Sequence, residues 1–247
     1  MKIFPLSEGS FTIDKTKIFI PFDKSSDELQ RRANGSLLVE IQPFAVITKR
    51  DVLLLDTGLG FHTQQGNMQL HQNLLDNGID PADVTKILLS HLHKDHAGGI
   101  QDMGGNNTIP VLSFPNAYYF VNEKELAFAN KNTTASYILE DFSLLSSSER
   151  LVLLDDDGLI DGYIEYEISG AHNPYHTVFW IREEGQTIFY GGDVAPQLQQ
   201  MKSRFVAKYD FDGRKSMELR MKWWGEGQKD HWTFLFYHDI KTPTITL

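Results

Sequence analysis

The decapeptide SHLHKDHAGG, residues 90–99, gathers three histidines and an aspartate within six positions. If His91 and His93 continue the extended conformation of the preceding apolar run, they point to the same side, because side chains alternate along a strand. Asp95 has the same parity, and a turn at the two glycines that follow would bring His96 back towards the same cavity. Converging imidazole and carboxylate groups suit zinc, iron or manganese, so the segment predicts a metal site.

The alternative for this segment is a loop of solvated polar side chains. That interpretation usually holds for a single histidine. Chance rarely assembles HxHxDH followed directly by two glycines, so we favour a metal site over a solvated loop.

The elements that must position these residues alternate between short strands and helices. A strand is expected at 86–90, two strands around a turn at 49–51 within 43–58, and a strand followed by a helix capped by Asn122 within 116–130. Further helices are expected at 68–78, with a short turn at Asp80-Pro81, and within 133–150 and 196–228. Strand pairs are expected within 151–169 and 177–193, and a last strand at 233–239. The pattern predicts one α/β domain over 1–247, with mixed rather than purely parallel sheets.

The composition narrows the class of partner. The chain has 247 residues, a net charge of −10 and no cysteine. An acidic chain lacks the basic face that nucleic acids or anionic membranes require, and without cysteine there is no thiolate ligand or nucleophile. No run reaches the roughly 20 apolar residues of a membrane helix, and the N-terminus lacks an apolar signal segment. We therefore expect a cytoplasmic protein with a small-molecule substrate and leave its oligomeric state open.

The sequence also resembles the metallo-β-lactamase fold superfamily. Residues 91–96 are similar to its HxHxDH signature, and VLLLDTGLG (52–60) to its early strand and Asp-Thr-Gly turn. AHNPYHT (171–177) resembles the GHTPGHT segment, YGGD (190–193) the segment of the bridging aspartate, and YHD (237–239) that of the last ligand. The resemblance covers residues 40–240 in the family's order. It implies an αββα sandwich: two mixed sheets face to face, helices outside, and metals at one edge.

The resemblance also implies a ligand set. His91, His93 and His172 would hold a first metal, Asp95, His96 and His238 a second, and Asp193 would bridge the two ions. Two divalent metal ions are therefore expected, zinc in the first place, with iron and manganese open. Asp95 would act as the catalytic residue, orienting the water and passing a proton to the leaving atom.

Such a centre predicts a dinuclear hydrolase. Two metals share a water and lower its pKa, which yields a bridging hydroxide that cleaves a small ester, lactone, thioester or phosphoester. The chain has no GxSxG motif that would supply a serine nucleophile. The ligand pattern, which includes a bridging aspartate, Asp193, and no cysteine, is more similar to that of the lactonase, glyoxalase II-like and organophosphate-hydrolase branches than to that of β-lactamases. The acidic balance disfavours the tRNA-processing nucleases.

Two alternatives come from other functional classes. One is a di-iron redox or oxygen-binding protein on the same fold, which His93 disfavours because those relatives often have glutamate there. The other is a member that binds metal without catalysis, and the complete ligand set disfavours it.

Other residues have supporting or local roles in this interpretation. Asp56 is expected to fix a loop by accepting hydrogen bonds, and His176 to lie behind the ligands. We interpret His62, His71 and His231 as surface or local structural residues, and 155–158 as a solvated turn, because it lacks the spaced oxygens of a calcium loop.

Three departures from the family bear on the substrate. Tyr175 stands where the family has glycine, and its ring either narrows the cleft or brings a hydroxyl close to it. Lactonases often carry a tyrosine soon after the bridging aspartate, whereas here Val194-Ala195-Pro196 follow, which disfavours a lactone. Lys94 either presents a cation to an anionic substrate or is a solvated loop residue.

Overall fold

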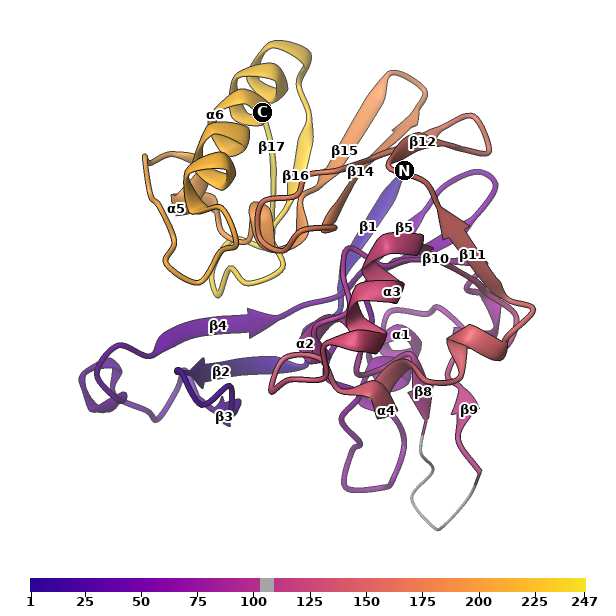
Figure 1. Cartoon of the computed structure of the whole chain (residues 1–247), viewed down its shortest axis with the longest axis horizontal. Coiled ribbons are helices and arrows are strands. Elements are labelled where there is room, and N and C mark those ends of the chain that lie inside the picture. Colours follow the sequence, from indigo (N-terminus) through magenta and orange to yellow (C-terminus); the bar gives the residue numbers. More distant parts are fainter. Residues whose placement is uncertain (103–108) are drawn as a thin grey trace.

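Two six-stranded sheets lie face to face at the centre of the computed structural model, which describes residues 1–102 and 109–247 (Figure 1). The first sheet has the order β1 (Lys2–Pro5), β5 (Phe44–Ile47), β6 (Val52–Leu55), β7 (Lys86–Leu88), β10 (Tyr118–Asn122) and β11 (Leu151–Leu154). The second has the order β12 (Asp157–Ile160), β13 (Ile164–Ile168), β14 (Thr177–Glu183), β15 (Gln186–Tyr190), β16 (Thr233–Leu235) and β17 (Thr244–Thr246). Each sheet combines parallel and antiparallel neighbours, as predicted.

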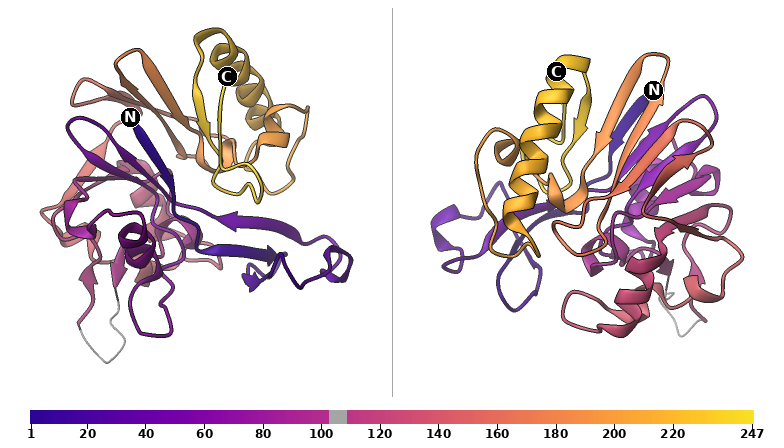
Figure 2. Two further views of the ribbon diagram at one scale, coloured as in Figure 1. Left: turned by 180° about the vertical axis from the view of Figure 1, so that it is seen from behind. Right: turned by 45° about the horizontal axis from the view of Figure 1, so that its top comes forward.

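Helices cover the outer face of each sheet (Figures 1 and 2). On the first sheet lie α1 (Gln69–Asp76), α3 (Glu123–Lys131) and α4 (Leu139–Phe142). On the second lie α5 (Leu198–Met201) and α6 (Gly213–Asp230), while α2 (Lys94–Ala97) sits at the end of β7. The αββα sandwich is therefore confirmed. No helix within the described ranges is long and apolar enough to cross a membrane.

Strand alternation explains how one sequence fills three apolar layers. In β6, Leu54 packs outwards against the α1 side, while Leu53 and Leu55 point between the sheets. In the second sheet, Phe179 points inwards and Trp180 outwards towards α6. Each strand thus supplies the inner layer and one outer layer, which is why these strands are apolar on both faces.

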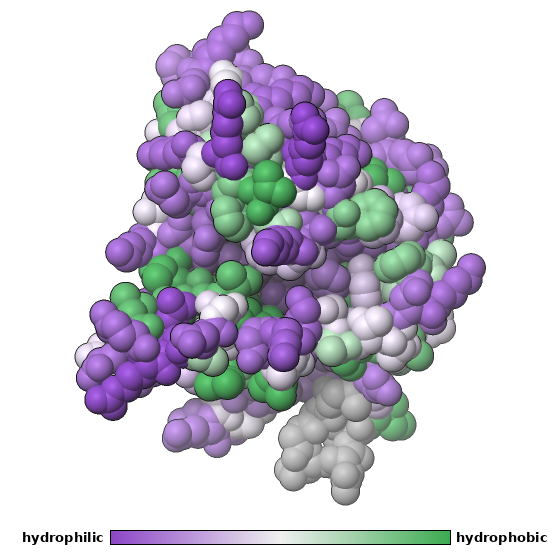
Figure 3. Space-filling model, turned by 60° about the vertical axis from the view of Figure 1, so that its left-hand side comes forward, coloured by the Kyte–Doolittle hydropathy of each residue, from purple (hydrophilic) through white to green (hydrophobic). Residues whose placement is uncertain are grey.

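Residues 9–41, which we call the arm, extend from the sandwich (Figure 1). They contain β2 (Gly9–Ile13), β3 (Ile20–Pro21), the short helix η1 (Leu29–Arg31) and β4 (Leu37–Ile41), with β2 at the centre of a three-stranded sheet. Ile18 and Ile20 are 60% and 58% exposed there. Figure 3 shows apolar side chains among the polar ones on the face that includes the arm.

Short elements complete the chain. They are η2 (Pro81–Asp83), η3 (Leu145–Ser147), η4 (Gly192–Val194) and a small sheet of β8 (Gln101–Asp102) and β9 (Val111–Leu112). The predicted turn at 80–81 is η2, whose cap Asp80 accepts a hydrogen bond from the Ala82 N–H.

The predicted strands and the two main N-terminal helices are present, but two helical predictions are only partly correct. Within 133–150 only α4 and η3 are helical, and within 196–228 the segment 202–212 is not. In that segment the N–H groups of Phe211 and Asp212 donate to the carbonyls of His172 and Ala171. Tertiary pairing of the backbone therefore replaces helical bonds there.

The topology brings several strand ends to one edge. β6 and β7 are parallel in the first sheet, and β15 and β16 are parallel in the second. Carboxyl ends of parallel strands meet at the same edge, so the segments that follow these strands converge. Those segments begin at residues 56, 89, 191 and 236, and each carries at least one predicted site residue.

We predict that Leu53→Ala lowers the free energy of unfolding by about 2–5 kcal/mol, because it leaves a cavity between the sheets. Leu53 is 0% exposed, whereas Leu159 in β12 is 61% exposed. Leu159→Ala is the matched control and should change stability by no more than about 0.5 kcal/mol. Urea unfolding curves measure both, and equal losses would contradict the packing described here.

Candidate metal centre

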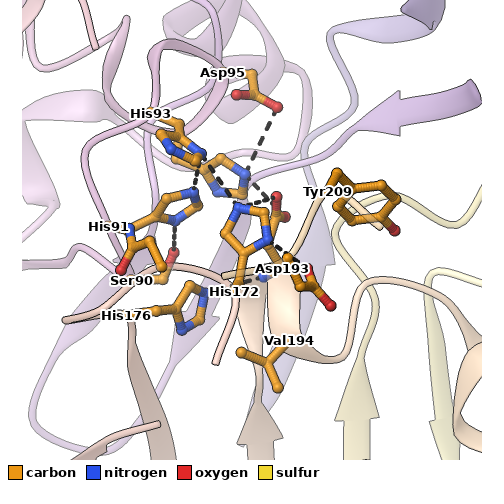
Figure 4. A network of polar contacts seen from close by, with 12 residues as sticks. Ser90, His91, His93, Asp95, His172, His176, Asp193, Val194 and Tyr209 are labelled. Atoms are coloured by element: carbon orange, nitrogen blue, oxygen red, sulfur yellow. Dashed lines mark hydrogen bonds and ion pairs between the residues drawn. The ribbon is translucent and has the colours of Figure 1, made fainter. Parts of the chain in front are cut away.

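The seven predicted donors lie together at this edge. Figure 4 labels His91, His93, Asp95, His172 and Asp193 among them. They form two groups, and within each group one donor atom per residue lies within 4.8 Å of the others. The first group is His91, His93, His172 and Asp193, and the second group is Asp95, His96 and His238. The structure thus brings together every residue that the sequence singled out as a candidate ligand.

Asp193 lies between the two groups because its carboxylate oxygens face different sides. Oδ2 is 3.3 Å from Nε2 of His172, whereas Oδ1 is 3.1 Å from Nε2 of His96 and 2.9 Å from Nε2 of His238. The preceding Gly192 has a φ of +47°, and a Cβ there would lie 2.7 Å from Nε2 of His176. A glycine is therefore required to place this carboxylate.

Asp95 reaches the second group by a route that strand parity did not predict. His93 is still extended, but residues 94–97 form α2, so Asp95 lies in a helical turn. Its Oδ2 is 3.7 Å from Nε2 of His96 and 3.6 Å from Nε2 of His238. The parity argument holds for His91 and His93, where Nε2 and Nδ1 are 2.9 Å apart, and is wrong for Asp95.

The two glycines after the motif act through close packing. Gly98 has ordinary right-handed helical angles, φ −59° and ψ −25°. A Cβ on Gly98 would lie 2.5 Å from the Leu59 carbonyl oxygen, and one on Gly99 would lie 2.1 Å from that of Thr57. The glycines let the end of α2 pack on the loop that follows β6. They are not required by the backbone angle that we expected.

Asp56 fixes the neighbouring loop, as predicted. Its carboxylate accepts hydrogen bonds from the Ser90 N–H at 2.7 Å, the Ser90 hydroxyl at 2.6 Å and the Tyr190 hydroxyl. It also lies 2.7 Å from Nδ1 of His96, and Ser90 Oγ lies 3.0 Å from Nδ1 of His91. Asp56 adopts a φ of 55°, which is uncommon for aspartate and is held by these four bonds.

Two further imidazoles are oriented through their second nitrogen. Nδ1 of His238 lies 2.8 Å from the Glu40 carbonyl oxygen. Nδ1 of His172 lies 2.9 Å from Oδ1 of Asp210, a residue that the sequence did not single out. With a proton on Nδ1, each ring leaves its Nε2 lone pair free to face the centre of its group.

His176 is fully buried and belongs to neither group. The backbone N–H of Asp193 donates to its Nε2 at 3.1 Å, and its Nδ1 lies 3.3 Å from Ser169 Oγ. It therefore holds the Asp193 backbone from behind, as the sequence interpretation expected.

The donors suit divalent cations by chemistry and by their unmet bonding capacity. His96 Nε2 and Asp193 Oδ1 are buried and lie 3.1 Å apart, yet neither makes a hydrogen bond of acceptable geometry within the described residues. A cation ligated by both atoms would satisfy this bonding capacity. Imidazole nitrogens and carboxylate oxygens that share one focus are suitable ligands for zinc, iron or manganese.

The electrostatics of the cluster favour the metal-binding form of His91, His93 and Asp193. For His96 and His238, burial lowers the pKa but the charge of Asp193 outweighs it, so the pKa of both is raised. Burial, reinforced by neighbouring imidazoles, holds the pKa of His91 and His93 well below the usual range. Burial alone would raise the pKa of Asp193, but His238, His96 and His172 outweigh it and hold that pKa well below its ordinary value. Neutral imidazoles and an ionised carboxylate are the states in which these groups coordinate an ion.

The residues considered for substrate contact are engaged elsewhere. Lys94 Nζ donates to the Lys17 carbonyl and lies 5.6 Å above the Phe19 ring, so it holds the arm. The Tyr175 ring packs on Phe128 of α3, with 5.8 Å between centroids.

Tyr209 is an aromatic side chain beside the cluster that the sequence analysis missed. Its ring centroid lies 6.2 Å from that of His172, and Gln200 Nε2 donates to its hydroxyl at 3.4 Å. Burial raises the pKa of Tyr209 to about 12, so its hydroxyl stays protonated at neutral pH. Figure 4 shows it next to the donor residues, although it follows Asp193 by sixteen positions.

The remaining histidines have local partners. His62 Nε2 lies 2.9 Å from the Asp102 carboxylate, His71 packs its ring edge on Phe114, and His231 ends α6 in a left-handed conformation. These histidines therefore have the local roles expected for them. The predicted turn at 155–158 is only partly correct, because residues 155–156 link β11 to β12 whereas Asp157 and Gly158 begin β12; none of the four belongs to a donor group.

Glu125 joins three segments behind the first group. The expected capping of α3 is present, because the Asn122 side chain accepts from the Lys124 and Glu125 N–H groups. The buried Glu125 carboxylate instead reaches the loop after β7. Its Oε1 accepts from the Leu92 N–H at 2.9 Å, the Tyr137 hydroxyl at 3.1 Å and the Asn173 amide at 3.1 Å. Leu92 and Asn173 neighbour candidate ligands, so this carboxyl group supports both loops.

Comparison with known families gives one match that spans most of the chain. The family model described as the metallo-beta-lactamase superfamily matches residues 39–238. A stretch of 112 residues is 32% identical to the N-acyl homoserine lactonase AttM of Azorhizobium caulinodans. This stretch covers 42% of the present chain and 38% of the length of that lactonase.

Solved structures of similar fold align along nearly the whole chain. A probable metal-dependent hydrolase from Staphylococcus aureus aligns with a TM-score of 0.79 and 22% identity, covering 99% of this chain and 91% of that one. The hydrolase AbOPH of the beta lactamase superfamily gives 0.75 and 22%, covering 99% and 89%. AidC, a dizinc quorum-quenching lactonase in complex with a product, gives 0.69 and 21%, covering 98% and 88%.

We predict that wild-type stability relative to Glu125→Gln falls as the pH rises from about 4.5 to about 7. Burial raises the pKa of Glu125 from 4.5 to about 7, so the folded chain holds this proton where the unfolded chain has lost it. The resulting stabilisation is complete below the unfolded pKa and is lost as the pH rises through the folded pKa. The relative change is at most about 3 kcal/mol.

Urea unfolding at a series of pH values measures this difference. Glu123→Gln removes an exposed carboxylate from the same helix and is the matched control. A stability difference between wild type and Glu125→Gln that does not vary with pH would contradict the assignment.

Proposed function

The chain belongs to the metallo-beta-lactamase superfamily, and on this premise we propose that it is a metal-dependent hydrolase that uses two divalent metal ions to cleave a small ester, lactone, thioester or phosphoester. Zinc is the ion we assign first. The single observation that carries the proposal is the position of Asp193. One of its oxygens faces each donor group, as a carboxylate shared by two ions would.

The seven donors divide into two ligand sets in this proposal. His91, His93 and His172 hold the first ion, Asp95, His96 and His238 hold the second, and Asp193 binds both. When bound, such ions act as Lewis acids, polarising the carbonyl or phosphoryl group under attack and making water a stronger acid. The protein's contribution is to hold the donors in fixed orientations, through Asp56 for His96 and through His176 for the Asp193 backbone.

Asp95 is the proposed catalytic residue. The side chains of Asp95 and Asp193 are almost equally accessible, at 13% and 12%, so access does not distinguish them. Asp193 has both oxygens within 3.3 Å of imidazoles, whereas the nearest imidazole nitrogens to Asp95 Oδ2 lie at 3.6 and 3.7 Å. Asp95 therefore has the looser contacts, and we assign to it the orientation of the attacking water and the transfer of a proton to the leaving atom.

Lactones are the first substrate class to test. The similarity to the lactonase AttM supports them. The residues after Asp193, Val194 and Ala195, provide no hydroxyl. The Tyr209 ring lies beside His172, but its hydroxyl accepts from Gln200 on the side of the ring away from the donors (Figure 4). Esters, thioesters and phosphoesters complete the panel, because the same ligand set serves each of them.

We predict that protein purified without added metal retains about two divalent ions per chain and hydrolyses at least one member of this panel. Metal quantification by plasma emission spectrometry and turnover assays on the same sample measure both. Asp193→Asn and His93→Ala should lower turnover at least about a hundredfold and reduce the metal content, because each removes a proposed ligand.

The matched control is His62→Ala, which removes a histidine that pairs with Asp102 and belongs to neither donor group. It should keep turnover and metal content within about twofold of wild type. Full activity of Asp193→Asn, or a metal-free chain that turns over substrate, would contradict the proposal.

A further inference from the structure

A buried carboxylate stands directly behind His172. Asp210 Oδ1 lies 2.9 Å from His172 Nδ1, and the Asp210 side chain is only 1% exposed. Its Oδ2 is buried and has no hydrogen-bond partner within the described residues. Within the described ranges no lysine or arginine lies within ion-pair distance of it, so His172 is its close polar partner, while the buried Arg220 interacts with its charge only at longer range.

We propose that Asp210 is a positioning residue that tunes the affinity of the first metal ion through His172. The inference rests on the dinuclear site proposed above. A buried carboxylate without a cation is costly unless it is compensated. Here the imidazole N–H provides one hydrogen bond, and a cation bound at Nε2 on the far side of the ring would provide the compensating charge.

The backbone fixes Asp210 in register with its partner. The backbone N–H groups of the next two residues pair with the His172 segment. Phe211 donates to the His172 carbonyl at 2.9 Å, and Asp212 donates to the Ala171 carbonyl at 2.8 Å. The segment that carries Asp210 therefore contacts both the backbone carbonyl and the ring of His172. The backbone that carries Asp210 cannot move away from His172 without breaking this pairing.

A buried arginine fastens the other end of the segment. Arg220 of α6 is 0% exposed and donates from Nη1 to the Val194 carbonyl at 2.9 Å and from Nη2 to the Phe205 carbonyl. Val194 follows Asp193, so one guanidinium connects the bridging carboxylate's loop to the segment that carries Asp210. The geometry therefore couples Asp210 to two members of the first donor group.

The arrangement repeats on the second group. Asp56 lies 2.7 Å from Nδ1 of His96 in the same way that Asp210 lies 2.9 Å from Nδ1 of His172. Each group therefore contains one histidine supported by a carboxylate. Such a carboxylate fixes the tautomer and makes Nε2 a stronger donor, and its loss typically weakens metal binding by about 10- to 100-fold. Asp210 acts on the first ion and Asp56 on the second.

The test is a zinc titration of metal-free Asp210→Asn against a chelator of known affinity, compared with wild type. Asparagine can still accept the hydrogen bond from Nδ1, so a purely structural role would be preserved and only the charge is lost. We expect the affinity for one ion to fall by about 10- to 100-fold while the other stays within about threefold. The melting temperature of the metal-free protein should not fall, because the variant loses a buried charge that no bound ion offsets in that state.

Two further variants assign the effect. Asp212→Asn changes an exposed neighbour that caps α6 without touching His172, and it should leave both zinc affinities unaltered. His238→Ala removes a donor of the second group. In that background Asp210→Asn should still weaken the binding of the ion that remains.

The outcomes separate this inference from the proposed function. If wild-type protein binds no zinc, the dinuclear site itself is wrong. If wild type binds two ions, and Asp210→Asn leaves both zinc affinities unchanged or lowers both equally, the role of Asp210 is overturned. If the Asn variant lowers the metal-free melting temperature and leaves the affinities intact, Asp210 has a structural role only, which also overturns the inference.

Discussion

The structure depends on one buried carboxylate that is shared by two clusters of imidazoles. Asp193 is nearly inaccessible, and its charge is tolerated because His96, His172 and His238 surround it. Those histidines come from both sheets, so the interaction also fixes how the sheets meet at this edge. The glycine before Asp193 and the loops after β6, β7 and β16 all serve to bring these groups within about one hydrogen-bond length of each other.

Around this centre the protein uses buried polar groups that do not face the centre themselves. Asp56 stabilises an uncommon backbone angle with four hydrogen bonds, and Glu125 connects three segments through one oxygen. Each group is costly to bury alone and becomes favourable only when its partners are in place. The orientation of the donors therefore depends on loops from both sheets, because these loops must assemble before any one of them is fixed.

Much of the fold could be predicted from the sequence because it rests on local patterns. The hairpin of β14 and β15 follows from two apolar runs around Glu183-Glu184-Gly185, and α3 begins at Asn122, whose side chain caps it. The predictions were less accurate where distant contacts decide the conformation. Segment 202–212 pairs its backbone with residues 171–172 instead of forming a helix, and the arm is held by a bond from Lys94 to Lys17, 77 positions away.

The candidate donors could be identified from the sequence, because HxHxDH is compact and the resemblance to the family's other motifs assigned His172, Asp193 and His238. The sequence also determined the layered architecture, since strands that are apolar on both faces must be covered on both sides. The conformation that brings Asp95 to its group, a helical turn, and the pairing of Asp210 with His172 depend on tertiary contacts. Asp210 and His172 are 38 positions apart, and Glu125 and Leu92 are 33 apart. A hydrogen bond between such residues leaves no periodic trace in the chain, because it depends on where separate loops meet in space.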